Sequence, residues 1–113
     1  MTKESMSKFE AVLLLSPEIT NSIKKNIIDD FSALIKDNSG KIVEVEDWGL
    51  RDLTYKIGNF SKAFYSFFQI EIDGSKIESI KKNISQNENC IRHIFIKVSN
   101  HQELPTMLNN EKK

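Results

Sequence analysis

Basic and aromatic residues lie close together in the strand-like segments of this chain. Arg and aromatic side chains together suit nucleic-acid contact, because the rings stack on bases and the guanidinium makes forked hydrogen bonds to phosphate. A single Lys on a strand is usually only solvated, so no member is informative by itself. The group as a whole favours RNA contact, and its members are Arg51, Lys56, Lys62, Arg92 and Lys97 together with Tyr55, Tyr65 and Phe67.

No residues are spaced for catalysis, metal binding or nucleotide binding. The two histidines, His93 and His101, have no Cys–His or Asp–His–Ser spacing that would organise a nucleophile. Cys90 and His93 alone leave a zinc site incomplete. The four glycines form neither G-x-x-x-x-G-K-[ST] nor G-x-G-x-x-G. We therefore expect no enzyme activity, no cofactor, no metal and no small-molecule substrate.

Charge and cysteine content limit the remaining functions. The 113 residues fit one domain, and 16 Lys and Arg against 16 Asp and Glu give a formal net charge of zero. A neutral chain cannot hold RNA by overall charge, so RNA contact must be local or shared with a partner. The single Cys90 suits a reducing compartment, and the apolar run 11–15 is too short for a membrane span or signal peptide. We expect a cytoplasmic protein without membrane contact.

Alternating apolar residues predict four strands. They cover residues 8–15, residues 41–46 with a ribbon that continues to 57, residues 63–72 and residues 91–98, with a turn near Gly58-Asn59. Within 41–46 the alternation is imperfect, because Ile42 and Val43 are both apolar. This irregularity predicts either a bulge or a strand with both faces partly covered.

Two segments have helical periodicity. The first contains an apolar stripe formed by Ile23, Ile27, Phe31 and either Leu34 or Ile35. Either Ser16-Pro17 or Thr20 would begin it, and Asn38-Ser39-Gly40 would end it with the glycine in the left-handed exit. The second would begin at a capping box, Ser75-x-x-Glu78, and end at 87–89, with Ile77, Ile80 and Ile84 facing inward.

The resulting order, β-α-β-β-α-β, predicts a ferredoxin-like split βαβ fold of the α+β class. Right-handed crossovers place the first and third strands at the centre of a four-stranded antiparallel sheet and both helices on one face. Residues 8–98 form this domain, residues 1–7 an N-terminal extension and residues 99–113 a polar C-terminal tail.

The face of the sheet without helices, called the open face from here on, is expected to be apolar and ring-rich. Glu10 belongs outside, and the alternation places on the same face Val12, Leu14, Tyr65, Phe67, His93, Phe95 and Lys97. One interpretation is that the chain's own tail folds across this surface. We favour the other, a docking surface for a protein or for unstacked bases, because the apolar area exceeds what exposure to water favours.

An acylphosphatase-like enzyme is the alternative from a different functional class, because this fold also hosts small phosphatases that hold an anion after the first strand. The corresponding loop here is Ser16-Pro17-Glu18. It has no Arg and places a carboxylate where a phosphate would bind, which argues against the alternative.

The ribbon carries a family resemblance. Residues 46–57, EDWGLRDLTYKI, followed by KAFY at 62–65, closely resemble the second-to-third strand ribbon of the bacterial small-subunit ribosomal protein number six family, whose pattern is about E-[DE]-[WL]-G-x-R-x-L-A-Y-P-I. The opening Phe9-Glu10, the turn Ser16-Pro17 and the closing segment 89–93 are also similar. The resemblance covers about residues 8–98.

The resemblance implies a split βαβ fold without catalysis. It further implies binding to the central domain of small-subunit ribosomal RNA, as a heterodimer with small-subunit ribosomal protein number eighteen, which brings much of the positive charge. Three positions depart from the family pattern, namely Lys56 in place of Pro, Asn59 in place of Lys and His93 in place of a basic residue. The acidic C-terminus of some members is absent.

On this reading we assign residues to two contacts. The partner interface would contain Trp48, Arg51, Tyr55, Tyr65 and Phe67. The RNA contact would contain Phe9, Lys62, Arg92 and Lys97, as charged or stacking groups.

A stand-alone RNA-binding module of the RRM kind remains the nearest alternative, because it shares the order of elements. Lys62-Ala63-Phe64-Tyr65 resembles the start of its signature strand. However, Ser66 lies where that motif requires a stacking aromatic residue, and Tyr65 where it requires Gly or Ala.

Overall fold

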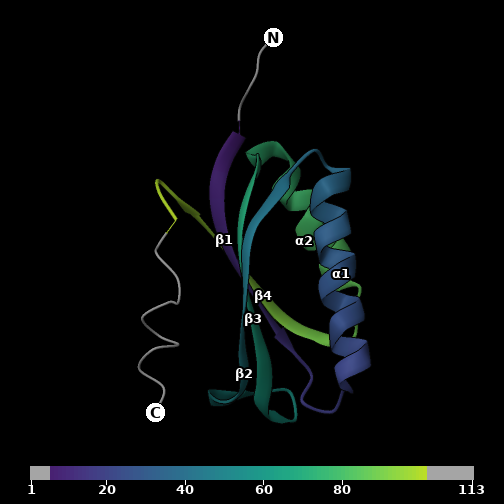
Figure 1. Ribbon diagram of the computed structural model, residues 1–113. Helices are drawn as coiled ribbons and strands as arrows, with labels where there is room; N and C mark the ends of the chain where they lie inside the picture. Colours follow the sequence, from purple (N-terminus) through teal and green to yellow (C-terminus); the bar gives the residue numbers. More distant parts are fainter. Residues whose placement is uncertain (1–5, 102–113) are drawn as a thin grey trace.

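Four strands form one antiparallel sheet in the computed structural model, which describes residues 6–101. The strands are β1 (Met6–Leu15), β2 (Lys41–Ile57), β3 (Phe60–Asp73) and β4 (Cys90–Val98). Their order is β2-β3-β1-β4, so the predicted central and edge strands are confirmed. The helices α1 (Asn21–Asp37) and α2 (Ile77–Ser85) lie on one side of the sheet, on the right in Figure 1. The ferredoxin-like fold class is therefore confirmed.

The strands are longer than the sequence pattern indicated. β2 is continuous, so the predicted strand 41–46 and the ribbon after it are one element, and β1 begins at Met6 inside the predicted N-terminal extension. The pairing of β2 with β3 shifts between Ile42 and Glu44, which confirms the bulge among the two interpretations of this irregular segment. Most of the predicted C-terminal tail, residues 102–113, lies outside the described residues.

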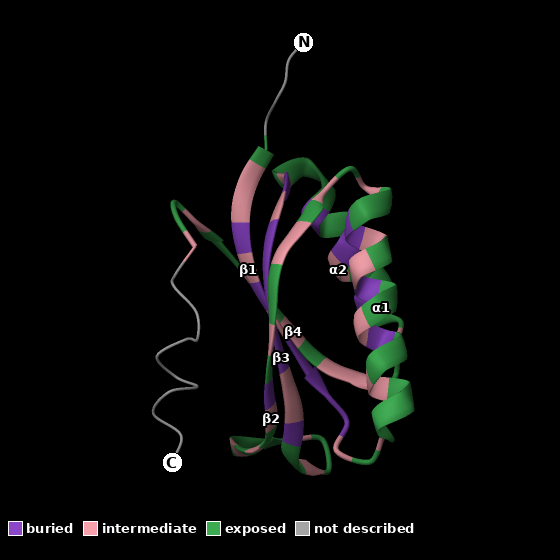
Figure 2. Ribbon diagram, in the orientation of Figure 1, coloured by how far each residue is buried: buried purple, intermediate pink, exposed green. Residues whose placement is uncertain are grey.

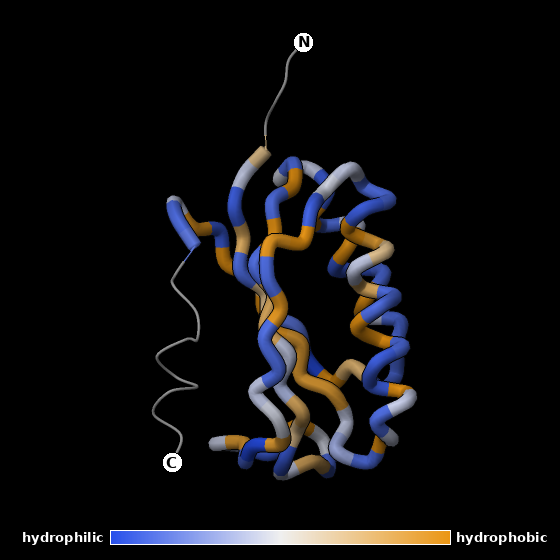
Figure 3. Tube along the Cα trace, in the orientation of Figure 1, coloured by the Kyte–Doolittle hydropathy of each residue, from blue (hydrophilic) through white to orange (hydrophobic). Residues whose placement is uncertain are grey.

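The core lies between the sheet and the two helices. Figure 2 shows buried segments along the central strands and on the inner sides of the helices, and Figure 3 shows hydrophobic residues along the same segments. The Phe31 and Phe68 rings pack with their centroids 4.5 Å apart, which joins α1 to β3. The core residues are Phe9, Ala11, Leu13 and Leu15 of β1, Ile27, Phe31 and Ile35 of α1, Phe68, Ile70 and Ile72 of β3, and Ile77, Ile80 and Ile84 of α2.

One of the two predicted starts of α1 is confirmed, whereas the predicted start of α2 is not. Thr20, one of the two candidates, caps α1, and its Oγ1 accepts a hydrogen bond from the Ile23 N–H at 3.1 Å. The capping box predicted at Ser75 and Glu78 is wrong. Asp73 instead accepts a hydrogen bond from the Ser75 N–H at 2.9 Å and begins a short 3₁₀ helix, η1 (Gly74–Lys76), that precedes α2. This hydrogen bond to the charged carboxylate lowers the pKa of Asp73.

The C-terminus of α1 ends in a Schellman motif, but with the roles of two residues exchanged relative to the prediction. The Ser39 N–H donates to the Lys36 carbonyl at 2.9 Å, and the Gly40 N–H donates to the Ile35 carbonyl at 2.8 Å. Ser39, with φ +65°, takes the left-handed position that we assigned to Gly40. Gly40 is needed for another reason: a Cβ there would lie 2.8 Å from Ile35 Cγ2 and 3.0 Å from the Ile35 carbonyl oxygen.

Two single substitutions at this turn are expected to have opposite effects on the free energy of unfolding. Ser39→Gly relieves left-handed strain, and we expect the free energy of unfolding to rise by about 0.5–1 kcal/mol. Gly40→Ala forces a methyl group against the helix backbone and should lower it by about 1–3 kcal/mol. Urea unfolding of both variants measures this, and a stabilised Gly40→Ala variant would contradict the packing described here.

Candidate docking surface on the open face of the sheet

The strand register determines which side chains share the open face. Directly paired residues of neighbouring strands point to the same side of a sheet. Pairing therefore groups Glu44, Gln69, Glu10 and Ile96 in one row, Glu46, Phe67, Val12 and Ile94 in the next, and Gly49, Tyr65, Leu14 and Arg92 in a third. The open face thus has an acidic and amide row beside an apolar and aromatic region.

The predicted face of β4 is wrong. Phe95 pairs with Ala11 and His93 with Leu13, both of them core residues, so these side chains point toward the helices. Phe95 packs on Phe31 at a centroid distance of 6.2 Å. The residues that replace them on the open face are Ile94 and Ile96, which are 42% and 57% exposed, together with Arg92.

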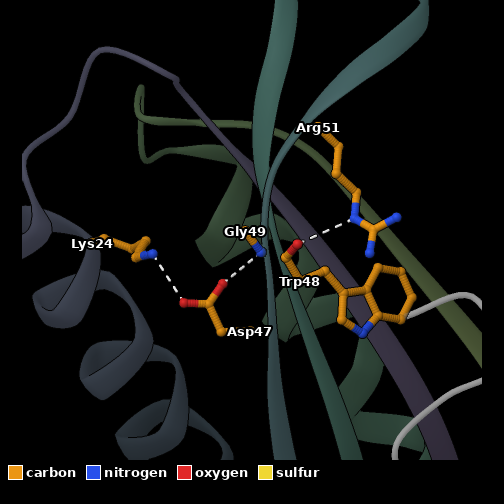
Figure 4. A network of polar contacts seen from close by, with 5 residues as sticks. All are labelled: Lys24, Asp47, Trp48, Gly49 and Arg51. Atoms are coloured by element: carbon orange, nitrogen blue, oxygen red, sulfur yellow. Dashed lines mark hydrogen bonds and ion pairs between the residues drawn. The ribbon is translucent and has the colours of Figure 1, made fainter. Parts of the chain in front are cut away.

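Four of the predicted interface residues form one cluster. The Trp48 ring stacks on Phe67 at a centroid distance of 5.2 Å with an interplanar angle of 13°, and on Tyr65 at 6.1 Å and 23°. The Arg51 guanidinium lies 5.6 Å from the Trp48 ring, and its Nε donates to the Trp48 carbonyl at 3.2 Å, as Figure 4 shows. The indole Nε1 donates to Glu46 Oε1 at 2.7 Å. We call Trp48, Arg51, Tyr65 and Phe67 the aromatic cluster.

A bulge in β2 brings the cluster together. Asp47 pairs with Ser66 and Gly49 with Tyr65, so Trp48 is an extra residue between them. The extra residue reverses the alternation, which turns Arg51 to the open face and Leu50, paired with Phe64, to the helix side. Without the bulge, Arg51 would point away from Trp48.

Two contacts of Asp47 hold the bulge, and Figure 4 shows both. Its Oδ1 accepts a hydrogen bond from the Gly49 N–H at 2.8 Å, and its Oδ2 pairs with Lys24 Nζ of α1 at 3.0 Å. The Lys24 side chain is only 15% exposed, and its ammonium lies 4.6 Å from the centroid of the Phe64 ring. Gly49 has φ +78°, a conformation that other residues rarely adopt. Sequence analysis identified neither Lys24 nor Asp47 as contributors.

A hollow of about 430 Å³ lies beside the aromatic cluster, between the tip of the ribbon and the open face. Tyr65 belongs to both sites. Tyr55, 81% exposed, and Arg92, also exposed, are the other predicted residues that line it. The remaining lining residues are Leu14, Leu53, Thr54, Lys56, Ile57 and Ile94. The hollow therefore combines apolar walls with positive charge from Arg92 and Lys56.

The residues assigned to RNA do not come together. Phe9 is 7% exposed and belongs to the core, so its ring is not available for stacking on a base. Lys97 pairs with Phe9 and therefore points to the helix side instead of the open face. Lys62 lies on the ribbon, where its Nζ pairs with Asp52 at 2.9 Å. Only Arg92 of this set lies on the open face.

The Cys90 thiol and the loop at Ser16, which were considered for catalysis, lie in environments that do not favour it. Burial raises the pKa of the Cys90 thiol to about 11, so it is a poor nucleophile at neutral pH. The Glu18 N–H donates to Ser16 Oγ at 3.2 Å, so this amide of the first loop is used within the chain. Among residues 6–101 no three His, Cys, Asp or Glu side chains are grouped to hold a metal ion. No helix in the same range has the length and apolar character to cross a membrane.

Comparisons with known proteins agree on one family. The family described as Ribosomal protein S6 matches residues 8–97. The small ribosomal subunit protein bS6 of Rickettsia felis is 39% identical over 103 residues, which are 91% of this chain and 85% of that protein. The protein of the same name from Rickettsia canadensis is 39% identical over 107 residues, 94% of this chain and 88% of that one.

Solved structures confirm the fold. The 30S ribosomal protein S6 of Thermotoga maritima superposes with a TM-score of 0.78 at 20% identity and covers 82% of this chain and 88% of that one. The C-terminal domain of the MgtC protein of Mycobacterium tuberculosis has a TM-score of 0.59 at 8% identity and covers 90% of this chain and 98% of that one. Because the second protein has a different name and little identity, the fold alone does not specify a function.

The bulge offers a direct test of how the aromatic cluster is positioned. A Cβ at Gly49 meets no atom within 4 Å, so Gly49→Ala changes only the backbone preference. We expect it to lower the free energy of unfolding by about 1 kcal/mol and to shift the emission of Trp48. Gly58→Ala, also at positive φ with open space but in the ribbon turn, is the matched control and should leave the emission unchanged. Equal emission changes in both variants would contradict this role of the bulge.

Proposed function

The chain belongs to the ribosomal protein S6 family, and from this membership we propose that it is a structural constituent of the small ribosomal subunit. In this proposal it binds the central domain of small-subunit ribosomal RNA together with small-subunit ribosomal protein number eighteen. The observation that carries the proposal is the aromatic cluster on a sheet face without helices, in a chain whose named relatives are small-subunit ribosomal proteins. The ribosome would then be its location in the cytoplasm.

The partner would bind at the aromatic cluster and the adjoining hollow. The aromatic cluster consists of Trp48, Arg51, Tyr65 and Phe67, and the hollow is lined in part by Tyr55. Aromatic and Arg side chains are enriched in the buried centres of protein interfaces, where they give large contact area for little conformational entropy. The exposed Ile94 and Ile96 extend the apolar surface across β4. An occupant of this surface would shield side chains that are otherwise in contact with water.

The RNA contact needs positive charge that this neutral chain does not have in excess. Arg92, exposed at the margin of the hollow, supports a phosphate contact beside the partner, and Lys62 adds a second cation on the ribbon. Lys97 would contribute only where RNA also reaches the helix side. Phe9 is not part of the proposal, because it packs in the core. A basic partner would supply the remaining charge, since phosphate contacts dominate RNA affinity.

We further propose that the protein has no catalytic activity. Its family supports this, because the named relatives are ribosomal proteins. The protonated Cys90 thiol and the internally bonded loop at Ser16 add chemical support. Neither group is prepared to attack a substrate or to hold a phosphate.

The alternative of a stand-alone RRM-like module has less support. Such modules stack bases on exposed rings at the centre of the sheet. Here Phe67 is 3% exposed because Trp48 is stacked on it, and Ser66 is fully buried on the helix side. Tyr65 is the remaining candidate for base stacking on this strand.

The main experiment measures binding of the full chain to a fragment of the ribosomal RNA central domain, with and without the partner protein. We expect tight binding only when both proteins are present, because the positive charge is shared between them. Filter binding at several salt concentrations gives both the affinity and the number of phosphates contacted. Equally tight binding by this chain alone would favour the stand-alone module.

A pair of cation variants on β4 locates the RNA. Arg92→Ala should weaken RNA binding of the two-protein complex by about 1–3 kcal/mol and reduce the salt dependence by about one counterion. Lys97→Ala removes a cation from the opposite side of the same strand and is the matched control, with a smaller expected loss. Equal losses for the two variants would place RNA on both sides of β4 and would contradict an RNA contact centred on the hollow.

A further inference from the structure

The Lys24 side chain of α1 packs on the sheet and not along its own helix. Its Nζ pairs with Asp47 Oδ2 of β2 at 3.0 Å and lies 4.6 Å from the centroid of the Phe64 ring of β3. Lys25, the next residue of the helix, instead pairs with Asp29 of the same helix and is 74% exposed, against 15% for Lys24. Lysine side chains are mostly exposed, and fixing one in place costs conformational entropy. A lysine in this position therefore indicates a structural role for its charge.

The surroundings of this ion pair favour it over an ordinary surface pair. Water screens exposed pairs, so most of them contribute little to stability. The Phe64 ring shields the Lys24 ammonium from water and attracts it through a cation–π interaction. The Asp47 side chain remains 52% exposed, so the pair avoids most of the cost of removing two charges from water. Lys24 thus offers Asp47 a cation at a fixed position.

Asp47 connects this ammonium to the bulge of β2. While its Oδ2 contacts Lys24, its Oδ1 accepts the hydrogen bond from the Gly49 N–H at 2.8 Å. A Cβ at Gly49 would meet no atom within 4 Å, so packing around this residue does little to hold its left-handed backbone. The carboxylate contact is therefore an important restraint on the peptide units that make Trp48 the extra residue.

The aromatic cluster lies on the other side of the same peptide units. Figure 4 shows Lys24 and Asp47 on one side of β2 and the side chains of Trp48 and Arg51 on the other. Arg51 Nε donates to the Trp48 carbonyl, a backbone group, and its guanidinium lies near the indole ring. A rotation of the backbone at the bulge therefore moves the guanidinium and the indole together, and with them the stack of the indole on Phe67.

We propose that Lys24 is a positioning residue of the docking surface, which acts through Asp47 and does not touch the partner. It holds Trp48 and Arg51 in the arrangement that the partner meets. Side chains that are already ordered raise affinity, because binding then does not have to order them. This inference rests on the proposed function only where it identifies the occupant of the aromatic cluster as a protein.

The coupling between helix and docking surface acts in both directions. By thermodynamic linkage, a partner that favours one arrangement of the cluster also favours the contact between Lys24 and Asp47 that accompanies it. The occupied open face should therefore stabilise the first turn of α1, where the Lys24 N–H donates to the Thr20 carbonyl at 2.9 Å. Helix and partner would lie on opposite sides of the sheet and still affect each other.

Fluorescence of the chain alone tests the positioning, because Trp48 is the only tryptophan. Lys24→Met keeps a long flexible side chain over Phe64 but removes the charge. We expect a shifted Trp48 emission and about a twofold rise in acrylamide quenching under native conditions, as the bulge opens locally. Lys24→Arg should restore the values of the unchanged chain. Lys25→Met, which removes the neighbouring exposed cation, is the matched control and should not alter them.

Partner affinity tests the coupling in a double-mutant cycle with Arg51→Ala. Lys24→Met should weaken binding of the partner protein by about fivefold or more, although the residue lies outside the docking surface. The same substitution should weaken binding less in the Arg51→Ala background, because one of the two positioned groups is then absent. In the unchanged chain, partner binding should slow hydrogen exchange of the amide at residue 24, and Lys24→Met should reduce this effect.

Three outcomes overturn the proposal. The first is a Lys24→Met chain whose Trp48 emission and quenching match those of the unchanged chain. The second is a pair of binding losses, for Lys24→Met and Arg51→Ala, that simply add. The third is failure of Lys24→Arg to restore the fluorescence. Absence of partner binding by the unchanged chain contradicts the proposed function instead, and the fluorescence of the variants then decides whether Lys24 positions the cluster.

Discussion

The aromatic cluster depends on a single inserted residue. β2 and β3 pair regularly from Glu44 to Asp47, and the insertion of Trp48 reverses the alternation for the residues that follow. This reversal is what lets Arg51 lie over the indole that precedes it by three positions. The insertion is stable because Gly49 accepts a left-handed backbone and because α1 reaches across the sheet edge with Lys24 to hold Asp47. A helix on one side of the sheet thereby positions a surface on the other.

The open face has two chemically different halves, and they suit different occupants. Around Glu10 and Gln69 it is polar, and a histidine of the same chain lies there. Around Trp48 and the hollow it is apolar with positive charge at Arg51 and Arg92. A chain with no net charge can combine these halves because its charged residues are concentrated in particular rows and strands of the sheet. No overall excess of positive or negative residues is needed for this. Local arrangement, rather than net charge, is therefore the property on which recognition would depend.

Periodicity was sufficient to predict the elements, their order and the fold, because each core-facing stripe is apolar. It was insufficient for β4, where both sides of the strand are apolar. In β4, either Ile94 and Ile96 or Phe95 and its alternate neighbours could have faced the core. The Phe95 side chain faces the core in the structure, where its ring packs against Phe31. The position of the bulge at Trp48 depends on Lys24, more than twenty residues away, which no local pattern contains. Ser39 and Gly40 exchanged roles because close packing on Ile35 outweighs the left-handed preference of glycine.

The two bulges of β2 also affect how this sheet meets other sheets. β2 is an edge strand, and an edge strand offers unpaired amides and carbonyls to any extended chain nearby. Irregularities at Val43, at Trp48 and between Asp52 and Ile57 interrupt that row of groups in three places, which disfavours in-register addition of a foreign strand along its length. The insertion that builds the aromatic cluster is therefore also expected to disfavour the addition of another strand along this margin.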